Sequence, residues 1–230
     1  MKKLLVVLSV WVTVLPNLYS KNVQDIEQTE AVLSVEGDIK ASMYVSMKKE
    51  DQETWKLISE IKKFGFTFRK ETARFILLNN QIIPLHWSRK GEAEVNFNWK
   101  ERVINFKEKK QDGTIPLNDG DLGPATAQIK LRLDLRNYDI SSLPDKLEYK
   151  VYYKGKVKKR VFKINGLETI STPLGEYLTI KVTRLRQQAG DNREQVFWLA
   201  PDLDFAIIQI LNDDGKRRVK IKMKKENSYP

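Results

Sequence analysis

Short segments in which apolar and polar residues alternate recur along most of this chain. Between Glu176 and Arg186, for example, Leu178, Ile180 and Val182 fall on one face, and mainly polar residues fall on the other. A period of two is typical of a β-strand with one buried face. About a dozen such segments with short connections predict a mainly β fold, in which a large antiparallel sheet curls into a barrel or half-barrel.

The strongest strand signals lie in residues 166–210. Ser171–Gly175 predicts a tight turn, because its proline fixes a φ value that the turn needs and its glycine tolerates a positive φ. Residues 196–200 are apolar at every position rather than at alternate ones. A strand of this kind is covered on both faces, so Trp198 is predicted to be a core residue.

Residues 125–137 fit two structures. Apolar and polar residues alternate from Ile129 to Leu135, as they do in a strand. Apolar residues also recur at helical spacing, and Asp121 stands where the N-cap of a helix would lie. If the segment is helical, it is the only substantial helix of the domain, and it would cover or plug the concave side of the sheet.

Three phenylalanines occupy alternate positions, Phe64, Phe66 and Phe68. In an extended chain they would lie side by side, on one sheet face or at its rim. A curled sheet with one short helix either closes on its own side chains or leaves an apolar concavity. Because a large exposed apolar surface usually marks a binding site, these phenylalanines are candidate contacts for a lipid or another apolar ligand.

Two strand segments are rich in basic residues. In the last one, Lys220, Lys222 and Lys224 alternate with apolar residues that are predicted to face inward, and a second basic run contains Lys158 and Arg160. Lysines on a strand often protect a sheet edge from pairing with other chains. The same five residues are candidate contacts for an anionic surface, and the sequence leaves both explanations open.

Composition narrows the possible chemistry. The chain contains no cysteine and one histidine, His86, which excludes disulfides, thiolate nucleophiles and clusters of histidine metal ligands. Glu92 and Glu94 fall on one predicted strand face, but their spacing does not set the separation that paired carboxylates need for glycoside hydrolysis. The sequence therefore predicts no catalytic residue, no cofactor and no metal site.

The N-terminus has the pattern of a bacterial signal peptide. Two lysines precede a mostly apolar segment from Leu4 to Leu15, which is too short to span a bilayer, and Pro16 ends it. Residues 1–20 are predicted to be a cleaved signal peptide, and residues 21–230 a single β-rich domain in the periplasm. A retained N-terminal anchor is the alternative.

The net charge of +11 would suggest nucleic acid as the partner of a cytoplasmic protein. An exported protein meets little nucleic acid, and the anionic partners around it are lipid head groups and acidic polymers. The predicted partners are therefore a lipid or apolar ligand, an envelope protein or an anionic membrane surface, and no nucleic acid. The oligomeric state stays open.

Three short motifs lie within residues 166–202. They are Gly166-x-Glu168, Thr172-Pro173-x-Gly175-x-Tyr177 and Trp198-Leu199-Ala200-x-Asp202. With them the chain resembles, over about residues 32–222, a bacterial exported family known as domain of unknown function 3108. The resemblance implies export and a helix at residues 125–137. Its motifs are turn and packing residues, so it implies no catalytic residue.

These observations support three functional hypotheses of different classes. The first is a non-enzymatic binding protein of the cell envelope that holds a lipid or another apolar ligand in its curved sheet. The second is a structural or assembly factor that docks to envelope proteins or anionic polymers through its basic face. The third is a hydrolase that depends on Asp or Glu alone, and it has the least support because no recognised catalytic motif is present.

Overall fold

The computed structural model describes residues 29–36, 40–185, 194–215 and 218–228. Fifteen strands form one sheet in these residues. Those of the first half are β1 (Thr29–Glu36), β2 (Ala41–Lys49), β3 (Thr54–Lys63), β4 (Phe66–Leu78), β5 (Gln81–Arg89), β6 (Ala93–Asn98), β7 (Val103–Glu108) and β8 (Gln111–Pro116). Those of the second half are β9 (Asp121–Leu122), β10 (Lys146–Tyr152), β11 (Val157–Thr172), β12 (Gly175–Arg184), β13 (Glu194–Ala200), β14 (Ala206–Asp213) and β15 (Arg218–Ser228).

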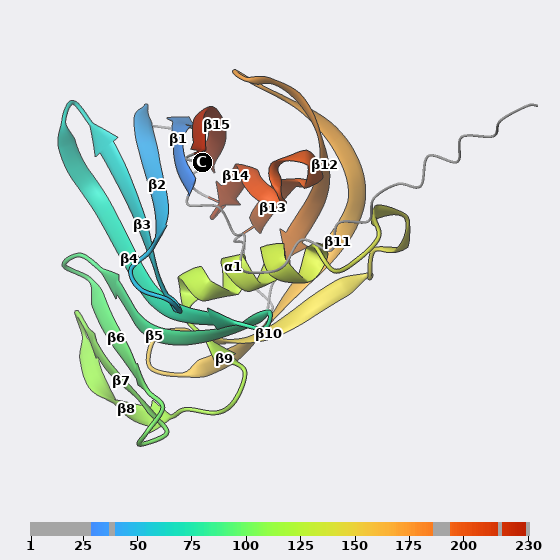
Figure 1. Cartoon of the computed structure of the whole chain (residues 1–230). Coiled ribbons are helices and arrows are strands. Elements are labelled where there is room, and N and C mark those ends of the chain that lie inside the picture. The colour runs from blue at the N-terminus through green and yellow to red at the C-terminus, as the bar shows by residue number, and fades with distance from the viewer. Residues whose placement is uncertain (1–28, 37–39, 186–193, 216–217, 229–230) are drawn as a thin grey trace, which may run out of the picture.

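The sheet is built from two meanders that join at the chain's first and last described strands. Its order runs from β8 back to β1, then to β15, and back from β15 to β9. Neighbouring strands are antiparallel except β9 and β10, which are parallel. The sheet curls strongly but its end strands β8 and β9 are not paired with each other (Figure 1). The predicted curled antiparallel sheet is therefore confirmed, and among the described strands it is open rather than closed.

One α-helix, α1 (Pro124–Leu135), lies in the hollow of the curled sheet (Figure 1). This confirms the helical interpretation of residues 125–137. The strand-like alternation arises because the helix is buried on several sides, so its apolar residues do not form one narrow stripe. The buried helix residues are Thr126, Ala127, Ile129, Leu131, Leu133 and Leu135.

The predicted N-cap Asp121 is wrong, because the helix begins after Gly123. Gly123 donates its backbone N–H to Thr126 Oγ1 at 2.8 Å, and Pro124 takes the first helical position, where a missing N–H costs nothing. Asp121 lies in β9 instead, and its Oδ2 accepts the backbone N–H of Asn118 at 2.8 Å.

The C-terminal end of the helix is tied to the connection between β13 and β14. Arg132 Nη2 and Arg136 Nε lie 2.8 and 3.0 Å from the two carboxylate oxygens of Asp204. Asp204 follows a short 3₁₀ helix (Pro201–Leu203) and adopts a positive φ of 53°. Because one carboxylate binds two arginines of the helix end, α1 is held against the connection between β13 and β14.

The bounds and burial of individual strands can be compared with the sequence pattern. Gln-Asp-Gly at residues 111–113 is a sequence typical of a turn, but these residues form the first half of β8. Residues 157–165 and 167–171 belong to one long strand, β11, in which the register shifts between Ile164 and Leu167, and Gly166 there has a φ of 92°. The prediction of a strand covered on both faces is confirmed, since every residue from Val196 to Ala200 is buried.

Candidate ligand-binding cavity

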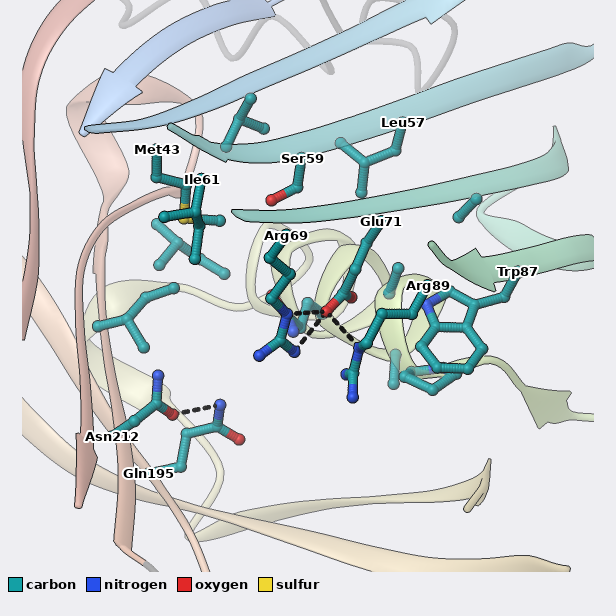
Figure 2. Close-up of a pocket in the computed structure, with 18 of the residues that line it drawn as sticks. Met43, Leu57, Ser59, Ile61, Arg69, Glu71, Trp87, Arg89, Gln195 and Asn212 are labelled. Carbon is teal, nitrogen blue, oxygen red and sulfur yellow. Dashed lines mark hydrogen bonds and ion pairs between the residues drawn. The ribbon is translucent and has the colours of Figure 1, made fainter. Parts of the chain in front are cut away.

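A cavity of about 1200 Å³ lies between the curled sheet and α1. One wall is apolar because alternate residues of β1, β2, β3 and β15 point into the hollow, as period-two strands require. Leu33, Met43, Leu57, Ile61, Ile221 and Met223 are among the residues that line it. Figure 2 shows Met43, Leu57 and Ile61 directed into this space.

The wall changes from apolar to charged across neighbouring strands. One row of paired residues runs from Val45 on β2 to Ser59 on β3, Glu71 on β4 and Arg89 on β5. All four line the cavity. Because paired residues on antiparallel strands lie directly beside one another, this register places a charged group next to the apolar wall.

The charged group consists of Arg69, Glu71 and Arg89. Glu71 Oε1 accepts hydrogen bonds from Arg69 Nε at 2.8 Å and from Arg89 Nε at 3.0 Å. Figure 2 shows the three side chains pointing toward one another in the cavity. Arg89 also pairs with Glu92 Oε2 at 3.2 Å and its guanidinium carbon lies 5.3 Å from the ring centre of Trp87. Two guanidinium groups thus share one carboxylate oxygen inside the cavity.

A bulge near the start of β4 brings Arg69 into position. Arg69 pairs with Ile61, but Thr67 pairs with the next residue of β3, so Phe68 is an extra residue without a direct partner. In a regular strand consecutive side chains point to opposite faces, but at a bulge two consecutive side chains can point to the same face. Both Phe68 and Arg69 accordingly line the cavity.

Cations outnumber acids among the residues that line this cavity. Eight of them are lysine or arginine, and three are acidic, namely Glu71, Glu92 and Glu108. Arg160 belongs to this set and lies 4.7 Å from the ring centre of Tyr153, which Lys158 also approaches at 5.5 Å. On the opposite wall Gln195 Nε2 donates to Asn212 Oδ1 at 2.8 Å (Figure 2). The polar part of the cavity therefore carries an excess of positive charge.

The structure separates the residues that the sequence proposed as ligand or surface contacts. Of the three phenylalanines, Phe68 lines the cavity, whereas Phe64 and Phe66 project from the tip of the β3–β4 hairpin outside its lining. The five basic candidates also divide: Lys158 and Arg160 lie on the cavity side of the sheet. Lys220, Lys222 and Lys224 lie on the outer side, since Val219, Ile221 and Met223 between them line the cavity.

A second hollow, of about 650 Å³, lies on the outer face of β11 to β15. Trp198 Nε1 donates to Glu168 Oε2 at 3.3 Å, and Lys181 Nζ lies 2.9 Å from the same oxygen. Lys181 and Trp198 together hold the pKa of Glu168 below its usual value. Two of the three sequence motifs thus meet here, and Lys220 and Lys222 line the same hollow.

The carboxylates and the histidine considered for catalysis do not assemble into a site. Glu92 precedes β6 and pairs with Arg89 in the cavity, while Glu94 Oε1 lies 3.7 Å from His86 Nε2. No group of three or more His, Asp or Glu side chains suited to a metal ion occurs among the described residues. In the same part of the chain no helix is long and apolar enough to cross a bilayer.

The sequence did not reveal the cluster of Arg69, Glu71 and Arg89. In the sequence these residues only alternate with residues of the other strand face, on two strands. Charged residues with this spacing are common on solvated surfaces. Their convergence depends on the register between β4 and β5 and on the curl of the sheet. Neither can be derived from residue spacing alone.

These features define an open, barrel-like β protein whose internal helix leaves an apolar cavity with a charged end. The chain belongs to the family described as Protein of unknown function (DUF3108), whose family model matches residues 28–227. Among curated proteins no significant match is found.

Solved structures that are similar to this chain share little sequence with it. A β-barrel-like protein of the domain of unknown function DUF1849 from Brucella abortus is 8% identical, with a TM-score of 0.54 over 89% of this chain and 98% of that one. The hypothetical lipoprotein YmcC from Escherichia coli is 13% identical, with a TM-score of 0.33 over 92% of each chain. The Brucella protein supports the fold class alone.

Proposed function

We propose that this protein is a non-enzymatic binding protein that holds a lipid or similar amphiphile in the cavity between the sheet and α1. The observation that carries the proposal is a cavity of about 1200 Å³ with an apolar wall and a cationic end. Sites for small molecules usually measure roughly 300–1,000 Å³ and combine apolar walls with a few polar groups. At about 1200 Å³ the cavity is somewhat larger than this range, which leaves room for a long apolar ligand, and its lining has the same combination of groups.

Burial of the ligand's hydrocarbon would supply most of the affinity. Each methylene group moved from water into the apolar part contributes about 0.8 kcal/mol. A chain of about ten methylenes contributes about 8 kcal/mol, which offsets much of the roughly 4–15 kcal/mol that association costs. The apolar wall formed by residues such as Leu33, Met43 and Ile221 is the proposed contact for this chain.

The charged end of the cavity favours an anionic head group. Arg69 and Arg89 share the carboxylate of Glu71, and Arg89 also pairs with Glu92. The net positive charge comes from the wider lining, where eight lysines and arginines face three acids. Guanidinium groups match carboxylate and phosphate oxygens with paired hydrogen bonds. The proposed ligand is therefore a fatty acid or another amphiphile whose head carries a carboxylate or phosphate.

The proposed location is the cell envelope, in the periplasm. It rests on the signal-peptide pattern of residues 1–20, which lie outside the described residues. An envelope location also explains why a basic protein would meet anionic amphiphiles rather than nucleic acid.

A fluorescent fatty-acid probe tests the proposal. The probe should bind the purified protein and be displaced by unlabelled fatty acid. Ser59→Trp places a large ring in the cavity and should abolish binding, whereas Ser46→Trp adds the same bulk on β2 between two cavity-facing residues and so points away from the cavity. If both variants bind as the unchanged protein does, the ligand does not occupy this cavity.

The head-group preference has its own test. The unchanged protein should bind a fatty acid more tightly than its uncharged methyl ester, and Arg69→Gln should remove most of this difference. Arg74→Gln is the matched control, because Arg74 lies on the same strand but outside the cavity lining, where it pairs with Glu50 at 2.6 Å. Equal affinity for acid and ester in the unchanged protein would show that the arginines serve only the fold.

A second candidate function is docking to an envelope protein or an anionic polymer through the outer face. It is supported by the outer hollow, where Lys220 and Lys222 lie on the surface of β15. Replacement of Lys220, Lys222 and Lys224 by Gln should then reduce retention on an anionic polymer column without changing binding of the fatty-acid probe. Unchanged retention would leave edge protection as the role of these lysines.

A further inference from the structure

The tip of the β3–β4 hairpin exposes more aromatic surface than any other described part of the chain. Phe64, Phe66 and Phe68 have 86%, 74% and 64% of their surface exposed, while no other large apolar residue in the described part of the chain exceeds 48%. Every residue from Phe64 to Arg69 is exposed. Isolated exposed apolar residues are ordinary, but an aromatic cluster at the end of a projecting hairpin marks an interaction surface.

The backbone of this tip holds Phe64 in a conformation that such a residue rarely adopts. Phe64 and Gly65 have φ values of 52° and 80°, the positive pair of a tight hairpin turn. The next hairpin uses Asn79 and Asn80 at the equivalent places, with φ values of 49° and 63°. Asparagine tolerates this region, whereas a bulky residue is disfavoured there. Phe64 gains no burial in return, so its presence is not explained by the fold.

Cations surround the aromatic tip. Lys62, Lys63, Arg69 and Lys70 flank it, against the acids Glu60 and Glu71. Lys63 Nζ lies 5.1 Å from the ring centre of Phe64. Glu60 takes both Lys62 and Lys70 as ion-pair partners, at 2.6 and 2.8 Å, which leaves the tip positively charged overall.

We propose that this aromatic tip inserts into the surface of an anionic phospholipid bilayer. Aromatic rings enter the boundary between head groups and acyl chains, and lysines beside them reach the anionic head groups. Each cation near such a surface contributes to attraction, which salt weakens. The combination of exposed rings, flanking cations and a turn residue kept against its backbone preference fits this partner.

The position of the tip relates docking to the cavity. Phe68 and Arg69 belong both to the hairpin end and to the cavity lining. A protein docked through this tip would therefore present the charged end of its cavity close to the bilayer. The docking proposal does not depend on what the cavity holds, because Phe64 and Phe66, the two most exposed phenylalanines, lie outside the lining.

Co-sedimentation with vesicles tests the docking. The vesicles contain phosphatidylcholine with or without phosphatidylglycerol, and all variants keep the same N-terminus so that the comparison isolates the hairpin. Phe64→Ser combined with Phe66→Ser should weaken binding to the anionic vesicles by at least about tenfold. Binding of the unchanged protein should also fall when salt is raised from about 0.05 to about 0.5 M.

Leu78→Ser is the matched control. Leu78 is 44% exposed at the other end of β4, about 40 Å from Phe66 along a strand of thirteen residues. The Leu78→Ser variant should bind vesicles as the unchanged protein does. Circular dichroism and urea unfolding of each variant verify that the sheet remains folded.

Three results would overturn the docking proposal. The first is equal vesicle binding by the phenylalanine variant and the unchanged protein. The second is loss of binding only when Lys220, Lys222 and Lys224 are replaced by Gln, which would move the contact to the outer face of β15. The third is a protein that does not bind vesicles but forms a concentration-dependent dimer in analytical ultracentrifugation, when the phenylalanine variant forms no dimer. A second copy of the chain would then cover the tip.

Discussion

Phe64 destabilises the turn in which it lies, yet it is central to the proposed contact with a bilayer. A non-glycine residue in the left-handed region costs about 1–3 kcal/mol, and the Phe64 side chain is 86% exposed at a φ of 52°. Natural chains retain such strain where it serves a site. The stability of the hairpin and the binding of a bilayer should therefore respond in opposite directions to its replacement.

Phe64→Asn should raise the free energy of unfolding by about 1 kcal/mol, because Asn followed by Gly65 is a favoured pair for this turn. Urea unfolding measures the change. Phe66→Asn, at the start of β4 and outside the turn, should give no such gain. No increase for Phe64→Asn would show that the turn is not strained.

Tyr149 is a buried phenol whose ionisation is coupled to folding. Its hydroxyl donates to Asp134 Oδ2 at 2.8 Å. Burial, and then the charge of Asp134, raise the pKa of Tyr149 well above its usual value. A group whose pKa is raised on folding stabilises the protein below its unfolded pKa, which for tyrosine is about 10, and that stability is lost as the pH rises further.

Tyr149→Phe should therefore reduce the alkaline loss of stability. Between pH 9 and pH 11 the unchanged protein should lose about 1.4 kcal/mol more of its free energy of unfolding than the variant does. Urea unfolding of both proteins at the two pH values measures this difference. The other titrating groups are the same in both proteins, so their contributions cancel. An identical pH dependence in both proteins would contradict a phenol that stays neutral in the folded state.

At the scale of elements, most of the fold could be predicted because it depends on local patterns. Alternation predicted about a dozen strands, and residue types located the turn at Ser171–Gly175. The helix was ambiguous because a helix inside a curled sheet is buried on several sides. The open sheet and the cluster around Glu71 depend on strand register and on contacts between distant segments, which residue spacing does not encode.

Strand β13 carries the most direct test of the packing. Trp198 is 6% exposed, with Glu168 and Lys181 against its ring on the outer face. Trp198→Ala should lower the free energy of unfolding by about 3–5 kcal/mol, through lost burial and the cavity left behind. Thermal and urea unfolding measure the loss.

Leu178→Ala on the adjacent strand β12 is the control for Trp198→Ala. Leu178 is 44% exposed, so its truncation should cost less than about 1 kcal/mol. Equal effects of the two substitutions would contradict a strand that is covered on both faces.

At the scale of the whole molecule, the sheet is larger than one short helix can fill. Fifteen strands curl around twelve helical residues, and about 1200 Å³ remains between them. An apolar cavity of this size is unfavourable when it is open to water and empty of ligand. Arg69 and Glu71 follow the aromatic hairpin on β4, so the charged cluster lies beside this hairpin on one wall of the cavity.

Native mass spectrometry of the protein purified from a bacterial envelope fraction tests the proposed binding function most directly. The unchanged protein should carry an additional mass that matches an anionic lipid or fatty acid, identified after extraction into organic solvent. Ser59→Trp should remove this mass, and Ser46→Trp should retain it. An unchanged protein that carries no bound amphiphile, and acquires none when fatty acid is added, would contradict a lipid-binding cavity.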